Sequence, residues 1–211
     1  MNIYFRFLVL LISGYLFFGC HKKNNNVQPA SAVSTMFNDN FVNNNNNWYE
    51  VNNDSIYVQV QNDSLFINNN CVVDAWDIFQ YIAVDTTLNF SIKATITWKK
   101  GVTNHGFGLI WGFQNVLAYR YEFEIVQSGE YIVAMEQNGT YTNLANWTIS
   151  NAINPKTNVL EIEKNGKQYI FYINGTQVFS TPYKPLLGYG IGFIVNNSQE
   201  VAITNLNVTQ W

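Results

Sequence analysis

Cysteine, histidine and charged residues are all scarce in this sequence. The 211 residues include 2 Cys and 2 His, too few for a disulfide framework or for a Cys-rich zinc module. Charged residues make up 12% of the chain, about half the usual share, and the net charge of −3 gives no basic surface. Nucleic acid is therefore not expected as a partner. Apolar residues are abundant instead, at 47%, and aromatic residues reach 16%, which is enough to form a folded core.

The first residues carry the features of an exported protein. Phe7–Phe18 is apolar, too short for a membrane-spanning helix of about 20 residues but suited to the apolar region of a signal peptide. The following Leu16–Cys20 resembles the lipobox of bacterial lipoproteins, where the signal is cut before a Cys that is then acylated. The resemblance implies a signal peptide over residues 1–19 and lipidation of Cys20. The alternative is an ordinary secretory signal in which Cys20 is a chance residue.

Residues 20–35 are polar and lack hydrophobic periodicity, so we expect them to form a flexible tether. The folded domain then spans residues 36–211. A lipidated Cys20 would hold this domain at the bacterial cell envelope, and the outer membrane is the expected location, with its periplasmic or surface face left open. The membrane is thus one expected partner, through the acyl anchor, and Cys71 is left without a disulfide partner.

From residue 36 onward, apolar and polar residues alternate as they do in half-buried strands. One face of the clearest stretch carries Leu88, Phe90, Ile92, Ala94, Ile96 and Trp98. No amphipathic helix is evident, and turn residues recur every 8 to 12 residues or so, the spacing of a β-sandwich. We therefore expect an all-β domain of about 12 to 14 strands in two packed antiparallel sheets.

Asn-Gly pairs indicate where the chain reverses. Pairs begin at Asn138, Asn165 and Asn174, and both residues of such a pair tolerate the positive φ of a tight hairpin turn. A two-residue loop at Asn165-Gly166 would pair Ile162 with Tyr169. The Asn138 pair would join the last two strands of a meander over residues 118–127, 130–137 and 140–148.

Several motifs, taken in order, resemble one structural family. They are Phe37–Phe41 with Trp48, Tyr121–Ile125 with Gly129–Tyr131, Asn158–Ile162 leading into Phe171–Gly175, Gly190–Phe193, and Val201–Leu206. Together they resemble a bacterial branch of the concanavalin A-like lectin and glucanase sandwiches, which includes laminin-G-like modules. The resemblance covers about residues 37–209 and implies a jelly roll with one concave sheet. It does not imply a single function.

Glu122 and Glu124 are the candidates for a pair of carboxylates. They alternate on one predicted strand, so their side chains would point the same way about 7 Å apart, as acid pairs do in glycosidases. The resemblance to glucanases implies a Glu-x-Asp-x-(x)-Glu pattern, but Val126 and Gln127 stand where its last Glu belongs. The composition of the strand favours a solvated polar stripe, with Arg120 neutralising Glu122. Ligand contact and catalysis are the two alternatives.

Other ligand-binding candidates are glycine and aromatic residues. Gly108 and Gly190 lie in strands whose aromatic residues share the other face, so either a flat ligand or neighbouring side chains would cover the glycine face. Trp76 and Trp147 lie near strand ends, where they could contact a sugar, and Tyr131 is the remaining candidate. Histidines do not cluster, so we expect no metal site and no cofactor, although structural calcium on scattered aspartates remains open. These aspartates are Asp54, Asp63, Asp74, Asp77 and Asp85.

Three functions remain open at this stage. The leading hypothesis is a non-catalytic envelope lipoprotein whose lectin-like domain binds a glycan or an envelope protein through a concave sheet. The second is a glycoside hydrolase that uses Glu122 and Glu124 on a polysaccharide. The third is a structural subunit of an envelope complex, which would expose an apolar patch.

Overall fold

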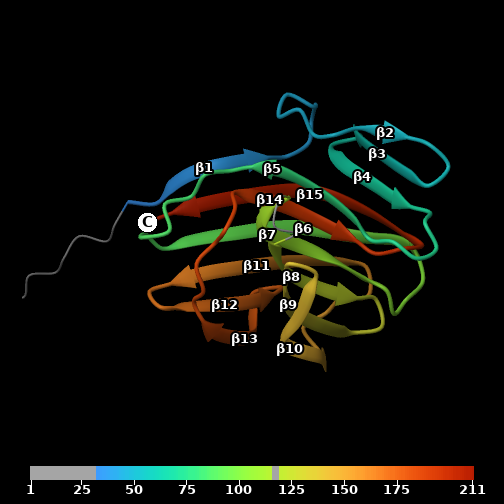
Figure 1. Ribbon diagram of the computed structural model, residues 1–211. Coiled ribbons are helices and arrows are strands. Elements are labelled where there is room, and N and C mark those ends of the chain that lie inside the picture. Colours follow the sequence, from blue (N-terminus) through green and yellow to red (C-terminus); the bar gives the residue numbers. More distant parts are fainter. Residues whose placement is uncertain (1–31, 116–118) are drawn as a thin grey trace, which may run out of the picture. The chain divides into compact units, whose positions relative to one another are not determined.

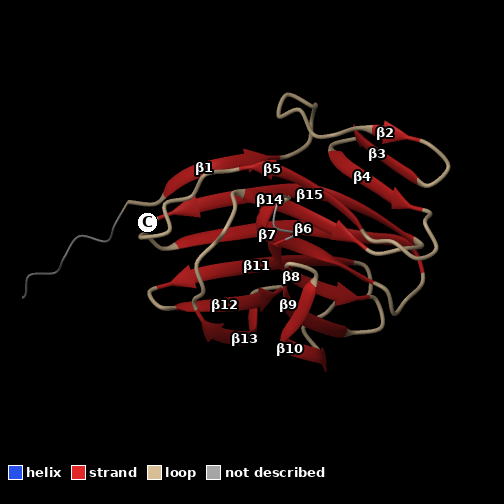
Figure 2. Ribbon diagram, in the orientation of Figure 1, coloured by secondary structure: helices blue, strands red, loops and turns tan. Residues whose placement is uncertain are grey.

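The computed structural model describes residues 32–115 and 119–211, which consist of strands and loops (Figure 2). The predicted signal peptide, Cys20 and most of the predicted tether lie outside the described residues. Within the described part of the chain, no helix has the length and apolar character needed to cross a membrane. The two-sheet antiparallel sandwich that the alternation predicts is confirmed.

The larger sheet has nine strands. They are β1 (Ser34–Asp39), β2 (Val51–Asn52), β3 (Ile56–Gln61), β4 (Ser64–Asn69), β6 (Phe90–Gly101), β11 (Thr157–Asn165), β12 (Gln168–Ile173), β13 (Thr176–Pro182) and β15 (Gln199–Gln210). Their order is β13-β12-β11-β6-β15-β4-β3-β2, and β1 also pairs with β15. Strand β15 is long enough to pair with β6 on one side and with both β4 and β1 on the other. Figure 1 shows this arrangement, with the red β15 between the green β6 and the blue β1.

The smaller sheet has six strands. They are β5 (Trp76–Tyr81), β7 (Gly106–Gln114), β8 (Tyr119–Val126), β9 (Glu130–Gln137), β10 (Thr140–Ile149) and β14 (Gly190–Val195), in the order β10-β9-β8-β7-β14-β5. The described residues thus form 15 strands, more than the 12 to 14 expected. One cause is β2, whose two residues are too few to show any alternation.

Aromatic side chains from both sheets meet in the core. Trp111 and Tyr121 of the six-stranded sheet stack at 5.1 Å between ring centroids, and both lie against Tyr169 of the nine-stranded sheet. All three are fully buried. Because side chains alternate along a strand, the residues next to Trp111 on β7 and next to Tyr121 on β8 point to the opposite, outer face of the six-stranded sheet.

The predicted alternation in β6 is confirmed for Phe90 to Ile96, whose apolar side chains are buried. Trp98, near the other end of the strand, is half-buried and packs against the core, as the alternation predicts. The prediction is wrong for Leu88, which precedes the strand and is 44% exposed.

The Asn-Gly turns are confirmed at two of three positions. Asn138 and Asn174 have positive φ, and each turn joins its strands through a two-residue loop. At the third turn only Gly166 has positive φ, and the loop lies one residue further along the chain. Ile162 therefore pairs with Phe171, not with Tyr169 as predicted. The pairing shifts by two residues, so each side chain keeps the predicted face.

Candidate functional site

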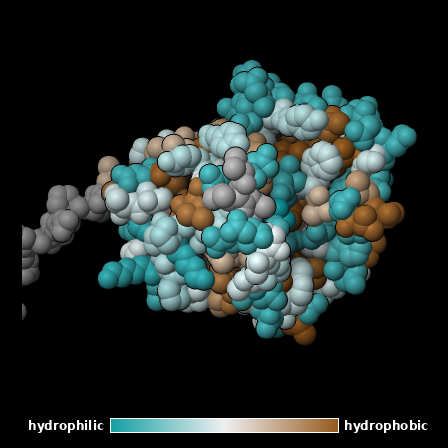
Figure 3. Space-filling view, viewed as in Figure 1, coloured by the Kyte–Doolittle hydropathy of each residue, from teal (hydrophilic) through white to brown (hydrophobic). Residues whose placement is uncertain are grey.

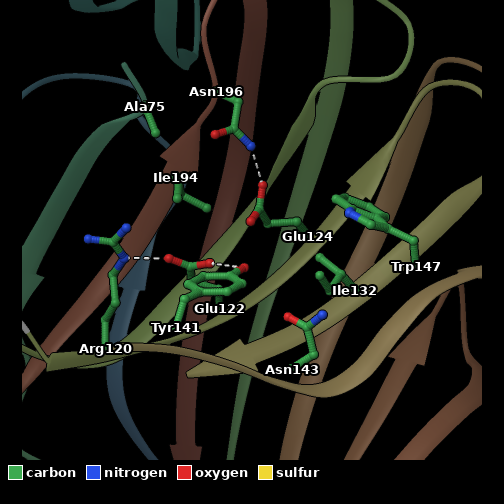
Figure 4. A pocket seen from close by; sticks show the side chains of 10 residues that line it. All are labelled: Ala75, Arg120, Glu122, Glu124, Ile132, Tyr141, Asn143, Trp147, Ile194 and Asn196. Carbon is green, nitrogen blue, oxygen red and sulfur yellow. Dashed lines mark hydrogen bonds and ion pairs between the residues drawn. The ribbon is translucent and has the colours of Figure 1, made fainter. Parts of the chain in front are cut away.

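A pocket of about 370 Å³ opens on the outer face of the six-stranded sheet (Figure 4). It is lined by Ala75, Arg120, Glu122, Glu124, Ile132, Tyr141, Asn143, Trp147, Ile194 and Asn196. Most of these residues come from β8, β9, β10 and β14, at alternating positions that cannot face the core. The pocket is therefore built by the pleat of the sheet.

Arg120 connects three acidic side chains from three strands. Its Nε lies 2.5 Å from Glu122 Oε1, its Nη1 lies 3.0 Å from Asp77 Oδ2, and its Nη2 lies 3.1 Å from Glu136 Oε2. Asp77 is on β5, three strand spacings or about 14 Å from β8 in a flat sheet. The long Arg120 side chain therefore extends across the outer face of the sheet and links β8 to β5.

Glu122 and Glu124 are only 1% and 3% exposed. The expectation of a solvated polar stripe is therefore wrong, because residues outside β8 cover the two carboxyl groups. Glu122 accepts hydrogen bonds from Arg120 and from the Tyr141 hydroxyl at 2.7 Å. Glu124 accepts one from Asn196 Nδ2 at 2.5 Å. Figure 4 shows both carboxyl groups at the floor of the pocket.

Burial raises the pKa of Glu124 well above its ordinary value, and the charge of Glu122 raises it further. Burial likewise raises the pKa of Asp77 to about 6, although the nearby Arg120 opposes this shift. One oxygen of Asp77, Oδ1, is buried without a hydrogen-bond partner. Burial thus favours the protonated forms of Glu124 in the pocket and of Asp77 beside it.

Gly106 on β7 makes room for Glu124. A Cβ at this position would lie 2.1 Å from Glu124 Oε2 and 2.8 Å from Asn196 Nδ2. Any side chain here would displace the carboxyl group or break its hydrogen bond. Gly106 is therefore part of the site, although the sequence singled out Gly108.

Two aromatic residues of β10 form the open side of the pocket. Tyr141 is 49% exposed and Trp147 is 42% exposed, so a ligand could reach both rings. In Figure 4 the Trp147 ring lies beside Ile132 and Glu124, whereas Tyr141 lies over Glu122. Asn143 on the same strand adds an amide, which donates to Asn146 Oδ1 at 2.9 Å.

The structure brings four of the sequence-predicted candidates together, namely Arg120, Glu122, Glu124 and Trp147. The others lie elsewhere. Tyr131 is buried on the core face, where its hydroxyl donates to the Val178 carbonyl. Trp76 is half-buried and packs against the core.

Gly108 and Gly190 are close to other atoms of the protein. A Cβ at Gly108 would lie 2.0 Å from the Phe123 carbonyl oxygen, and one at Gly190 would lie 2.7 Å from Phe113 Cβ. The glycines therefore accommodate neighbouring strands. This is the second of the two interpretations that the sequence left open.

Sequence reasoning missed Tyr141, Asn143, Asn196 and Asp77. Tyr141 was within reach, because the two-residue loop at Asn138-Gly139 places it opposite Glu136, as observed. Asp77 and Asn196 lie on β5 and after β14, far from β8 in the chain. No local pattern indicates that these strands meet.

In residues 32–115 and 119–211, no three His, Cys, Asp or Glu side chains are grouped so that they could hold a metal ion. The carboxyl pair itself has acid–base character. Glu122 accepts hydrogen bonds from Arg120 and Tyr141, whereas burial favours the protonated form of Glu124, and glycosidases likewise place two carboxyl groups in different surroundings. The third acid of the glucanase pattern is absent, since Val126 and Gln127 occupy its place.

No protein-family model and no curated protein matches the chain. Solved structures do share its fold. A protein of unknown function with a galectin-like fold from Bacillus subtilis has a TM-score of 0.56 at 12% identity, over 84% of this chain and 96% of that chain. An endo-β-1,3-glucanase from Pyrococcus furiosus has a TM-score of 0.54 at 10% identity, over 84% and 94%.

The CBM2 module of the evolved Dit protein of Lactobacillus casei BL23 phage J-1 has a TM-score of 0.55 at 9% identity, over 84% and 95% of the two chains. At such identities the likeness shows the fold alone. The domain is an all-β, concanavalin A-like jelly roll, as the sequence motifs predicted.

Proposed function

We propose that this protein is a non-catalytic, glycan-binding protein of the bacterial cell envelope. The observation that carries the proposal is the pocket, where the exposed rings of Trp147 and Tyr141 stand beside two buried carboxyl groups and the amides of Asn143 and Asn196. Flat apolar rings beside a few fixed polar groups suit a sugar, which has both apolar faces and hydroxyl groups. The pocket volume also falls within the range of about 300 to 1,000 Å³ for small-molecule sites.

The fold supports the same proposal more weakly. One structural neighbour is named as a glucanase and another as galectin-like, although each is less than 15% identical to this chain. On the face shown in Figure 3, hydrophobic residues form small groups among hydrophilic ones.

Binding can be tested with the purified full chain on a glycan array, followed by titration calorimetry. We expect Trp147→Ala to weaken binding of any glycan found by about 30-fold, the usual cost of removing an aromatic anchor. Tyr49→Ala is the matched control, since Tyr49 is also exposed but lies outside the pocket. Equal affinity in the two variants would place the ligand elsewhere.

Two other outcomes would replace the proposal. If no polysaccharide binds and a tight protein partner is recovered, the domain is not a lectin. If the protein releases reducing sugar and Glu124→Gln abolishes that release, the protein is a glycoside hydrolase.

The envelope location rests on the sequence around Cys20. We propose that acylated Cys20 anchors the domain to the membrane, since Leu16–Cys20 resembles a lipobox and follows a short apolar run. A second acyl chain makes such anchoring stable, as each buried methylene contributes about 0.8 kcal/mol.

A further inference from the structure

The pocket and its surroundings contain more negative than positive charge. Three carboxyl groups, those of Asp77, Glu122 and Glu136, share the single guanidinium of Arg120. Glu124 adds a fourth carboxyl group, and its partner is the neutral amide of Asn196. Even with one of the four protonated, the cluster keeps an excess of negative charge. An acidic glycan would be repelled, whereas a cation would be attracted.

Several hydrogen-bond donors of the pocket already have partners. Arg120 donates through all three of its nitrogens to carboxylates, and the Tyr141 hydroxyl donates to Glu122. The amide groups of Asn143 and Asn196 each donate one N–H, to Asn146 and Glu124, and keep a second.

Acceptors also remain free. Within the described residues no donor is found for Glu124 Oε1, Asn143 Oδ1 or Asn196 Oδ1. The buried Asp77 Oδ1 also has no partner. A ligand with a positively charged hydrogen-bond donor suits both these acceptors and the excess of negative charge.

We propose that the pocket selects glycans with free amino groups, that is, 2-amino-2-deoxy sugars of the glucosamine type, whose ammonium group binds Glu124. This inference rests on the proposed function and names its ligand class. The ammonium group would donate to Glu124 Oε1 and to the free amide oxygens, and its positive charge would stabilise the carboxylate form of Glu124, which burial alone disfavours. The sugar ring would lie against Trp147 and Tyr141, whose exposed rings also attract a cation. An N-acetylated sugar has the same ring but lacks the charge.

The experiment compares two oligosaccharides that differ only in this group. The full chain is titrated at about pH 6 with a β-1,4-linked glucosamine tetrasaccharide and with its N-acetylated counterpart; an amine with a pKa near 8 is protonated there. We expect the amino form to bind at least about tenfold more tightly. Added salt should weaken the amino form far more than the N-acetylated form.

Glu124→Gln tests the assigned partner, because it removes the carboxylate that a bound ammonium group would stabilise and keeps the shape. It should weaken binding of the amino form by about 10- to 100-fold while changing binding of the N-acetylated form little. Glu163→Gln is the control, since it makes the same change on a strand of the nine-stranded sheet, outside the pocket.

The outcomes separate the inference from the proposed function. Equal or tighter binding of the N-acetylated form, still dependent on Trp147, overturns the inference and leaves glycan binding intact. A preference for the amino form that persists in Glu124→Gln overturns the assignment of the ammonium to Glu124. Failure of both sugars and of all array glycans overturns the inference and the proposed function together.

Discussion

Asp77 shows how burial can outweigh ion pairing at a single residue. Arg120 lies 3.0 Å from its Oδ2 and favours the charged form, yet burial raises the pKa of Asp77 from 3.8 to about 6. The charges of Glu122 and Glu136 raise it further. The charged form of Asp77 is therefore less well accommodated in the folded protein than in the unfolded chain.

This shift predicts a pH dependence of stability. Because the folded-state pKa lies above the unfolded one, the folded protein binds more protons between about pH 4 and 6. The stabilisation is fully present below about pH 4 and is lost as the pH rises through 6, by up to about 3 kcal/mol. Urea unfolding of wild type and Asp77→Asn at several pH values would measure it.

The expected result is that the stability of wild type, relative to Asp77→Asn, falls across this window. Loss of the contact with Arg120 in the variant adds a constant offset, so only the slope is diagnostic. A difference that stays constant from pH 4 to 7 would contradict the raised pKa.

Local sequence patterns predicted the strands and the shared face of Glu122 and Glu124, because side-chain alternation is a property of the strand itself. They did not predict that both groups are buried. Burial depends on Tyr141 and Asn196, which reach Glu122 and Glu124 from other strands or loops. An alternating polar stripe looks the same in sequence whether water or another segment covers it.

At two turns, the same Asn-Gly dipeptide differs in the hydrogen bonds that its Asn side chain makes. Asn174 and Asn138 both begin Asn-Gly turns, with φ of 53° and 52°. Asn174 donates to the Ala152 carbonyl at 2.7 Å and to Asn158 Oδ1 at 2.8 Å, and it accepts from the Val159 N–H at 2.8 Å. For the exposed Asn138, no side-chain hydrogen bond is found in the described residues.

Replacing each Asn by Ala separates these side-chain contacts from backbone strain. Both variants place Ala at nearly the same positive φ, so the strain is matched. Asn174→Ala should lower the free energy of unfolding by about 2 kcal/mol more than Asn138→Ala, because it removes three side-chain hydrogen bonds, one of them to the buried Asn158. Thermal or urea unfolding would measure both. Equal losses would mean that the side-chain contacts of Asn174 contribute nothing.

At the scale of the whole molecule, strand order explains what the sequence could not reveal. On the outer face of the six-stranded sheet, β8 lies near β5 and β14, which are far from β8 in the sequence. Motif order predicted the jelly roll, since many weak motifs combine along the chain. The pocket depends on which distant strands become neighbours, and on side chains that no motif contains.

The proposed acyl anchor at Cys20 also concerns the whole molecule. It predicts that Cys20 is acylated and that Cys71 is not. If Cys20 is acylated, cells given a palmitate analogue should label wild type and Cys71→Ser but not Cys20→Ser. Cys71 is a suitable control because it is a free, half-buried thiol within the domain. Wild type should also partition into detergent, whereas Cys20→Ser should remain in the aqueous phase, since it lacks the buried acyl chains. Labelling that persists in Cys20→Ser would show that Leu16–Cys20 is not a lipobox, and the domain would then be exported without a lipid anchor at Cys20.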